Sequence, residues 1–164
     1  MTTPDLVSVV ITCYNQARFV AEAIESVLAQ TYPHYEITVV DDESQDNPAE
    51  VVAHYPQVKY VWQKNQDVSA ARNAGLGYSH GEFQVFIDAD DRFLPHAFER
   101  GVSLLKSHPE CGLVTGRHVY IDADGNRTPT IEERRHVERD HYYELLCANF
   151  IGCPATVMFR RSVF

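Results

Sequence analysis

The stretch EFQVFIDADDRF (residues 82–93) places three carboxylates directly after an apolar run. The apolar part, residues 83–87, is rich in β-branched and aromatic side chains and predicts a buried strand. Asp88, Asp90 and Asp91 follow at once. Each ionised carboxylate raises the cost of ionising its neighbours, and the chain already carries a formal net charge of -9. The pattern therefore predicts a cation, or a ligand that brings one, at the end of this strand.

Short apolar runs and amphipathic segments alternate over the first half of the chain. We predict strands at residues 6–11, 35–40, 58–62 and 83–87, and helices at residues 19–28, 48–55 and 69–78. Asn15 is predicted to cap the first helix. Near-continuous apolar strands separated by helices are typical of a parallel sheet covered on both faces. We therefore expect an α/β fold with a Rossmann-like, mostly parallel sheet and helices on both faces.

The pattern is less regular beyond Asp91. We predict helices at 95–107 and 142–148, strands at 113–120 and 155–159, a turn at 124–126 and a charged loop at 130–140.

Length and composition narrow the class of protein. The 164 residues, 45% hydrophobic and 23% charged, fit one globular domain. The acidic balance argues against a protein that binds a nucleic-acid backbone. The four cysteines lack C-x-x-C spacing, which favours free thiols over a zinc site. The apolar runs are too short to cross a bilayer, so we expect a cytoplasmic protein, with peripheral attachment to the inner face of a membrane as the alternative.

Polar side chains follow three of the predicted strands. They are Thr12 to Asn15, then Asp41 and Asp42, then the carboxylates after residue 87. Ligands of open parallel sheets bind beyond the carboxyl ends of the strands, so we expect these groups to converge. Mg²⁺ uses one or two carboxylates together with substrate phosphates, and Mn²⁺ also suits oxygen ligands. The carboxylates after residue 87 are thus explained if they bind a divalent metal ion that is held together with a diphosphate.

The remaining candidates have ordinary structural explanations as well. Asp41 or Asp42 can accept hydrogen bonds from a base or ribose, or can simply form a turn and helix cap. Tyr14 can stack on a base or pack in the fold. Arg72 can meet a phosphate or lie on the surface. Their combination at matching strand ends favours a binding site.

The motifs together resemble a known family. They are, in order, VSVVITCYNQARFVAEAIESVLAQTY, EITVVDDESQD, SAARNAGL and GEFQVFIDADD. This succession resembles the inverting family 2 glycosyltransferases of GT-A fold. The resemblance implies a nucleotide-diphospho-sugar donor, most commonly a UDP-sugar, and Mn²⁺ or Mg²⁺. It also implies transfer of the sugar, with inversion, to a hydroxyl of a glycan, lipid-linked or other acceptor, as in the synthesis of cell-surface polysaccharide.

The resemblance assigns roles around the nucleotide base. Thr12 and Tyr14 match the positions that flank the base. Asp42 matches the aspartate that reads the base, with Asp41 beside it.

The resemblance also assigns roles around the diphosphate. Asp88 matches the first aspartate of the D-x-D pair, which contacts ribose or sugar. The metal ligand is Asp90 or Asp91, because the extra aspartate leaves the register open. Arg72 matches the A-R-N element that borders the donor site.

One part of the family pattern is missing. The family's catalytic base is an aspartate or glutamate downstream of a segment like FRRSVF, which here forms residues 159–164 at the end of the chain. We therefore assign no base and expect a fragment of a single GT-A catalytic domain, truncated before the base. Within residues 1–164, about 1–92 are expected to form the nucleotide-sugar-binding half and 93–164 the start of the acceptor-side half. The alternative is a non-catalytic domain that binds nucleotide-sugar.

Overall fold

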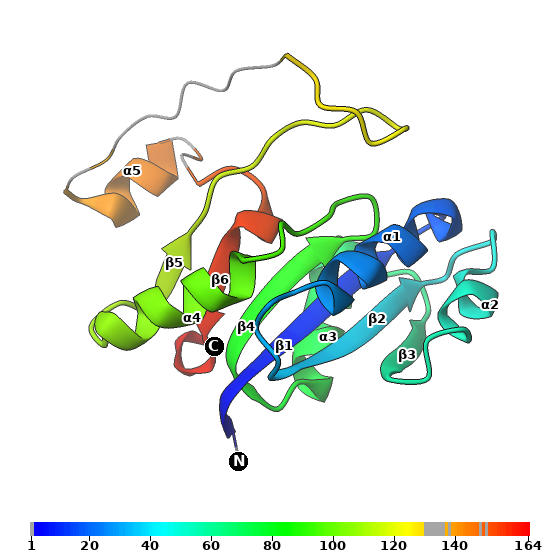
Figure 1. Ribbon diagram of the computed structural model, residues 1–164, viewed down its shortest axis with the longest axis horizontal. Coiled ribbons are helices and arrows are strands. Elements are labelled where there is room, and N and C mark those ends of the chain that lie inside the picture. The colour runs from blue at the N-terminus through cyan, green and yellow to red at the C-terminus, as the bar shows by residue number, and fades with distance from the viewer. Residues whose placement is uncertain (1, 130–136, 138, 148, 150) are drawn as a thin grey trace.

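The computed structural model describes residues 2–129, 137, 139–147, 149 and 151–164. Within them one mixed sheet has the strand order β3-β2-β1-β4-β6-β5 (Figure 1). The strands are β1 (Thr3–Cys13), β2 (Tyr35–Asp42), β3 (Val58–Gln63), β4 (Gly81–Asp88), β5 (Leu113–Thr115) and β6 (Val157–Arg160). The first four strands are parallel, whereas β6 is antiparallel to β4 and β5 is antiparallel to β6. This architecture confirms the predicted α/β class and mostly parallel sheet.

Helices cover both faces of the sheet (Figure 1). They are α1 (Ala17–Leu28), α2 (Pro48–Val52), α3 (Asp67–Tyr78), α4 (Ala97–Ser107) and the peripheral α5 (His141–Cys147). The side chains of α1, α2 and α4 share one apolar cluster with alternate residues of β1, β2 and β4, and α3 packs on the opposite face. None of the described helices has the combined length and apolar character that a bilayer span requires.

The central strand β1 is buried on both of its faces. Val9 and Ile11 point toward α1, and Val10 points toward α3; all three are at most 1% exposed. Complete burial of such a side chain stabilises the fold by roughly 1.5–3 kcal/mol. Gly75 of α3 lies directly over Val10, since a Cβ atom at Gly75 would come within 2.2 Å of Val10 Cγ1. The absence of a side chain therefore lets α3 approach the sheet closely.

The start of α1 differs from the prediction. The N-cap residue is Gln16, whose side chain makes no capping hydrogen bond. Asn15 has a φ of 54° and accepts a hydrogen bond from the Gln45 amide instead. The Ala17 amide donates to Asp46 Oδ2 at 2.8 Å, from the loop after β2. The prediction that Asn15 caps α1 is wrong because a carboxylate distant in sequence does so.

The strand predicted at 113–120 is shorter than expected. β5 ends at Thr115, which pairs with Val157, the first residue of β6. A 3-10 turn at Pro154–Thr156 precedes β6, so the ladder stops where its partner strand begins. Downstream, Ile121 bridges to Arg127 around the predicted turn. Most of the predicted charged loop at 130–140 lies outside the described residues.

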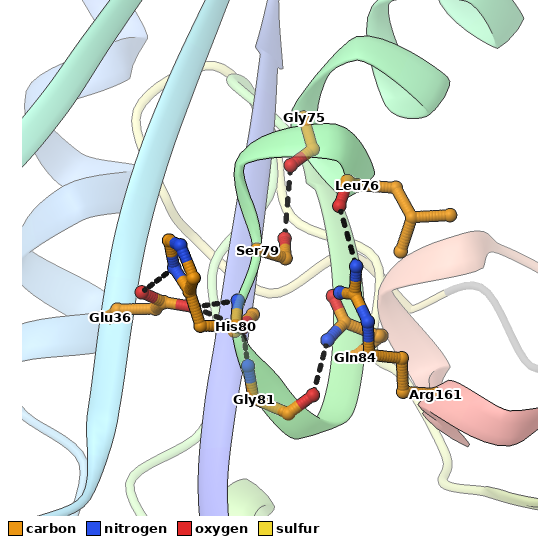
Figure 2. Close-up of polar contacts among 9 residues, drawn as sticks. Glu36, Gly75, Leu76, Ser79, His80, Gly81, Gln84 and Arg161 are labelled. Atoms are coloured by element: carbon orange, nitrogen blue, oxygen red, sulfur yellow. Dashed lines mark hydrogen bonds and ion pairs between the residues drawn. The ribbon is translucent and has the colours of Figure 1, made fainter. Parts of the chain in front are cut away.

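Hydrogen bonds to Glu36 connect neighbouring elements at the end of the sheet where the parallel strands begin (Figure 2). Its carboxylate accepts from the Ser8 hydroxyl and from both the amide and the ring of His80. Burial alone would raise the pKa of Glu36, but these donors and the nearby imidazole lower it below its usual value. The Ser8 hydroxyl in turn accepts from the Gly81 amide at 2.8 Å. This network joins β1, β2 and the turn before β4.

Candidate functional site

The carboxyl ends of the parallel strands surround an open cleft of about 560 Å³. This volume lies within the usual range of ligand pockets, about 300–1,000 Å³. Its lining residues come from the ends of β1, β2 and β4, the loop after β3 and the start of α3: Thr12, Cys13, Tyr14, Gln16, Asp42, Asn65, Asp67, Val68, Ala71, Asp88 and Asp90. The predicted convergence of strand-end side chains is thus present. Three further predicted site residues, Asp41, Arg72 and Asp91, do not line the cleft.

Asp88 is held by two partners at the cleft. Thr12 Oγ1 donates to Asp88 Oδ1 at 2.6 Å. Arg72 Nη2 lies 2.8 Å from Asp88 Oδ1 and 3.2 Å from Oδ2. Arg72 thereby compensates the charge of this carboxylate, which lies beside two other aspartates. The side chains of Arg72 and Asp88 are 24% and 34% exposed, so solvent screens the pair only in part.

Asp90 and Asp91 face different surroundings. Asp90 is exposed in the cleft, where Gln16 Nε2 donates to its Oδ2 at 2.9 Å. Asp91 is partly buried, with its Oδ2 3.9 Å from Cys153 Sγ. Burial, followed by the charges of Asp90 and Asp88, raises the pKa of Asp91, while His118 and the Cys153 thiol partly offset the rise. Of the two aspartates, Asp90 is therefore the one available to a ligand in the cleft.

Asp42 is nearly buried, at 4% exposure, yet its side chain borders the cleft. Its Oδ1 accepts two hydrogen bonds, from Gln63 Nε2 at 2.6 Å and from the Gln66 amide at 3.1 Å. The Asn65 side chain donates to the Asp42 carbonyl at 3.2 Å. The last residue of β3 and the segment after it therefore fix the end of β2.

Asp41 does not line the cleft and is buried, at 2% exposure. Its carboxylate accepts from the Tyr60 hydroxyl and from the Ser44 amide, the latter at 2.9 Å. Burial, together with the hydrogen bond to Asp41, raises the pKa of Tyr60 far above its usual value. In this structure Asp41 shapes the turn after β2, and its predicted contact with a ligand remains a prediction.

Residues 13 and 14 contribute a thiol and an aromatic ring to the cleft. Tyr14 is 53% exposed and offers its ring at the mouth. Cys13 is 2% exposed, and burial raises the pKa of its thiol to about 11. The thiol is therefore protonated near neutral pH and is not a nucleophile.

Sequence reasoning missed several residues that shape the cleft. Gln63 is the last residue of β3 and Asn65 follows it, so the same strand-end rule, applied to that strand, would have pointed to both. Gln16 and Cys153 carried no such signal, because each contacts an aspartate more than sixty residues away in sequence.

The donor set at the cleft suits a hard divalent cation. Asp88 and Asp90 supply carboxylate oxygens, which Mg²⁺ and Mn²⁺ prefer. Within the described part of the chain, no three His, Cys, Asp or Glu side chains come together as a metal-binding group. One or two carboxylates suffice where substrate phosphates supply further oxygens, so the residues present fit such an ion.

The family model of glycosyl transferase family 2 matches residues 8–164. The chain belongs to this family. An uncharacterised glycosyltransferase of Nostoc sp. is 36% identical over an alignment of 138 positions, and the alignment covers 77% of this chain and 43% of the relative. The family 2 chain described here thus spans less than half the length of that relative.

Solved structures share the fold. TarS of S. aureus, residues 1–349, superposes with a TM-score of 0.70 at 23% identity, over 96% of this chain and 47% of that TarS segment. TarS has also been solved with UDP-GlcNAc. A mannosyltransferase from Pyrobaculum calidifontis, in complex with GDP-Man and Mn²⁺, gives a TM-score of 0.69 at 21% identity, over 96% of this chain and 45% of that protein. At these identities the likeness shows the GT-A fold alone.

Proposed function

We propose that this family 2 chain binds the donor of an inverting glycosyltransferase, which transfers sugar from a nucleotide diphosphate to an acceptor hydroxyl. The observation that carries the proposal is the cleft, where the exposed ring of Tyr14 after β1 adjoins the carboxylates at the ends of β2 and β4. UDP-sugar is the first candidate donor, and the hydroxyl of a glycan or of a lipid-linked chain is the candidate acceptor. We also place the protein in the cytoplasm or at the inner face of a membrane.

Four residues of the cleft bind the donor in this proposal. Tyr14 stacks on the base at the mouth, with Thr12 on its other side. Asp42 accepts a hydrogen bond from a ring N–H of the base. Asp88, held in place by Arg72, accepts from the ribose or sugar hydroxyls. These side chains bind and orient the donor so that its anomeric carbon is presented to the acceptor.

Asp90 would hold a divalent cation, with Asp88 beside it. When bound, the ion would supply Lewis-acid stabilisation of the charge on the departing diphosphate. Asp90 is the better candidate than Asp91 because it is exposed in the cleft, whereas Asp91 is partly buried and has a raised pKa.

The reaction itself would be a single displacement. The acceptor hydroxyl attacks the anomeric carbon from the face opposite the diphosphate, which inverts the configuration. A carboxylate takes the proton of the hydroxyl as the new bond forms. We assign this base to none of the described residues.

A second function competes with catalysis, namely nucleotide-sugar binding without transfer. It stays open because we name no base: Asp122, for example, is engaged within its own turn, where it accepts hydrogen bonds from the Asp124 and Asn126 amides at 3.0 and 2.9 Å. Release of UDP from UDP-sugar by the chain, with or without an acceptor, would distinguish an enzyme from a binding domain.

Calorimetric titration of UDP tests the donor site directly. The titration is run with Mn²⁺ and with EDTA on the unmodified chain, on Asp90→Asn and Asp91→Asn, and on Asp124→Asn, an exposed aspartate that does not line the cleft. We expect metal-dependent binding that is lost in Asp90→Asn and retained in the other two variants. Loss in Asp91→Asn with retention in Asp90→Asn would reverse the assignment of the metal ligand. Absence of binding by UDP, TDP and GDP under every metal condition would refute the donor site.

A further inference from the structure

The carboxylate of Asp42 is fixed through one of its two oxygens. Gln63 Nε2 and the Gln66 amide both donate to Oδ1, at 2.6 and 3.1 Å. Asp42 and Gln63 are directly paired across β2 and β3, so the Gln63 side chain reaches Asp42 from a neighbouring strand in the sheet. The carboxylate cannot rotate about its Cβ–Cγ bond without breaking both hydrogen bonds.

The second oxygen, Oδ2, is the one left for a ligand. Among the described residues no donor contacts it, and the Asp42 side chain borders the cleft with Thr12 and Tyr14. An ionised carboxylate only accepts hydrogen bonds, so the Gln63 amide must present its nitrogen to Oδ1. Oδ2 is therefore a fixed acceptor at the edge of the cleft.

A fixed acceptor distinguishes nucleobases by their ring nitrogens. Uracil and thymine carry an N–H at N3, and guanine carries one at N1. Cytosine has an unprotonated nitrogen at N3, which would face the carboxylate as a second acceptor. A ligand that leaves a buried acceptor without a hydrogen bond loses much affinity. This loss is larger than the loss caused by a small change in the size of an apolar group.

We infer that Gln63 is a positioning residue that sets nucleobase selectivity, because it orients Asp42 so that Oδ2 accepts from a ring N–H. The inference rests on the proposed donor site. Without the Gln63 amide, Oδ1 keeps only the Gln66 amide, and the carboxylate gains freedom to turn. Selectivity for uracil over cytosine, and not merely the strength of binding, then depends on Gln63.

Parallel titrations of UDP and CDP, in the presence of Mn²⁺, test this role on the whole chain. Gln63→Met keeps the length of the side chain and removes its donor. Gln57→Met makes the same change on an exposed glutamine in the turn before β3 and serves as the matched control. Gln63→Asn keeps an amide on a shorter side chain, and thermal unfolding reports whether each variant is folded.

We expect Gln63→Met to weaken UDP binding about tenfold and to change CDP binding less than about twofold, since one hydrogen bond to a charged group is lost. The ratio of the two affinities would fall accordingly, with Gln63→Asn intermediate and Gln57→Met unchanged. If UDP and CDP weaken by the same factor, or if neither changes in a folded variant, the positioning role is refuted while the donor site stands. If the unmodified chain binds neither nucleotide, the donor site fails and the role of Gln63 fails with it.

Discussion

Arg72 and Asp88 form an ion pair at the cleft, with Arg72 Nη2 2.8 Å from Asp88 Oδ1. The pair joins the first helix turns of α3 to the last residue of β4. The pair explains how three aspartates are tolerated within four positions, because the guanidinium of Arg72 neutralises the charge of Asp88. Arg72 Nε is buried and has no hydrogen-bond partner among the described residues, whereas Nη2 donates to both oxygens of Asp88.

Replacing Arg72 by methionine is expected to disorganise Asp88. The carboxylate would keep only the Thr12 hydroxyl as a donor, and the unfolding free energy would fall by about 1–2 kcal/mol, as for a hydrogen bond to a charged group. UDP binding would weaken by about tenfold, since 1.4 kcal/mol corresponds to that factor. Arg100→Met, on an exposed arginine of α4, is the control. Equal effects of the two substitutions in denaturant titration and calorimetry would contradict the role of Arg72.

Asp91 is expected to destabilise the metal-free chain at neutral pH. Its pKa is raised above the ordinary value of 3.8, first by burial and then by its acidic neighbours. The folded chain therefore binds the proton more tightly than the unfolded chain does, so stability falls as the pH rises from below 3.8 through the raised pKa. Asp91→Asn removes this penalty and should raise the melting temperature at pH 7 by roughly 3 °C.

The gain from Asp91→Asn should shrink as the pH is lowered toward 3, where the aspartate is protonated in both states. Melting curves in EDTA between pH 3 and pH 7 measure this trend, with Asp124→Asn as an exposed control. A gain that is the same at both ends of the range would show that the charge of Asp91 is not its cause.

The four parallel strands were predictable because each contains a short apolar run, and the burial of β1 and β4 on both faces is typical of a parallel sheet. The strand-end rule likewise brought Thr12, Asp42 and Asp88 together, since parallel strands end at one edge. The contacts that hold these groups were not predictable. Arg72 reaches Asp88, and Gln63 reaches Asp42, through the packing of α3 and the register of β2 with β3, neither of which leaves a local signal.

The cap of α1 shows the same limit in detail. Asn15 has the residue type and the position typical of a helix N-cap, so sequence rules favour it as the cap of α1. The structure turns its backbone into the left-handed region, where its side chain closes the neighbouring loop and Asp46 takes the capping role. The choice between two capping residues depended on a loop thirty residues away.

Removal of the Asp46 carboxylate is therefore expected to destabilise the folded chain. Asp46→Ala leaves the Ala17 amide without its acceptor and should lower the unfolding free energy by about 1 kcal/mol. Asp124→Ala, which removes an exposed carboxylate elsewhere, should change it by less than about 0.5 kcal/mol. Urea titrations of the two variants measure the difference. A loss in Asp46→Ala no larger than in the control would mean that solvent replaces the cap at no cost.

Gly75 and Gly77 lie two positions apart in α3 and offer a matched pair. A Cβ atom at Gly75 would come within 2.2 Å of Val10 Cγ1, whereas one at Gly77 meets nothing within 4 Å. Gly77→Ala should stabilise the chain by about 0.5–1 kcal/mol, because alanine loses less backbone entropy in a helix. Gly75→Ala gains the same helical preference but overpacks the contact with Val10, at a cost of about 1–3 kcal/mol.

The net effect of Gly75→Ala should therefore be destabilising, and it should extend to the cleft. Pushing α3 away from β1 moves Arg72, one turn earlier in the same helix, relative to Asp88. UDP binding should weaken in Gly75→Ala and remain unchanged in Gly77→Ala. If both alanines stabilise the chain in urea titrations, the helix can shift without loss, and close packing of α3 on Val10 does not position Arg72.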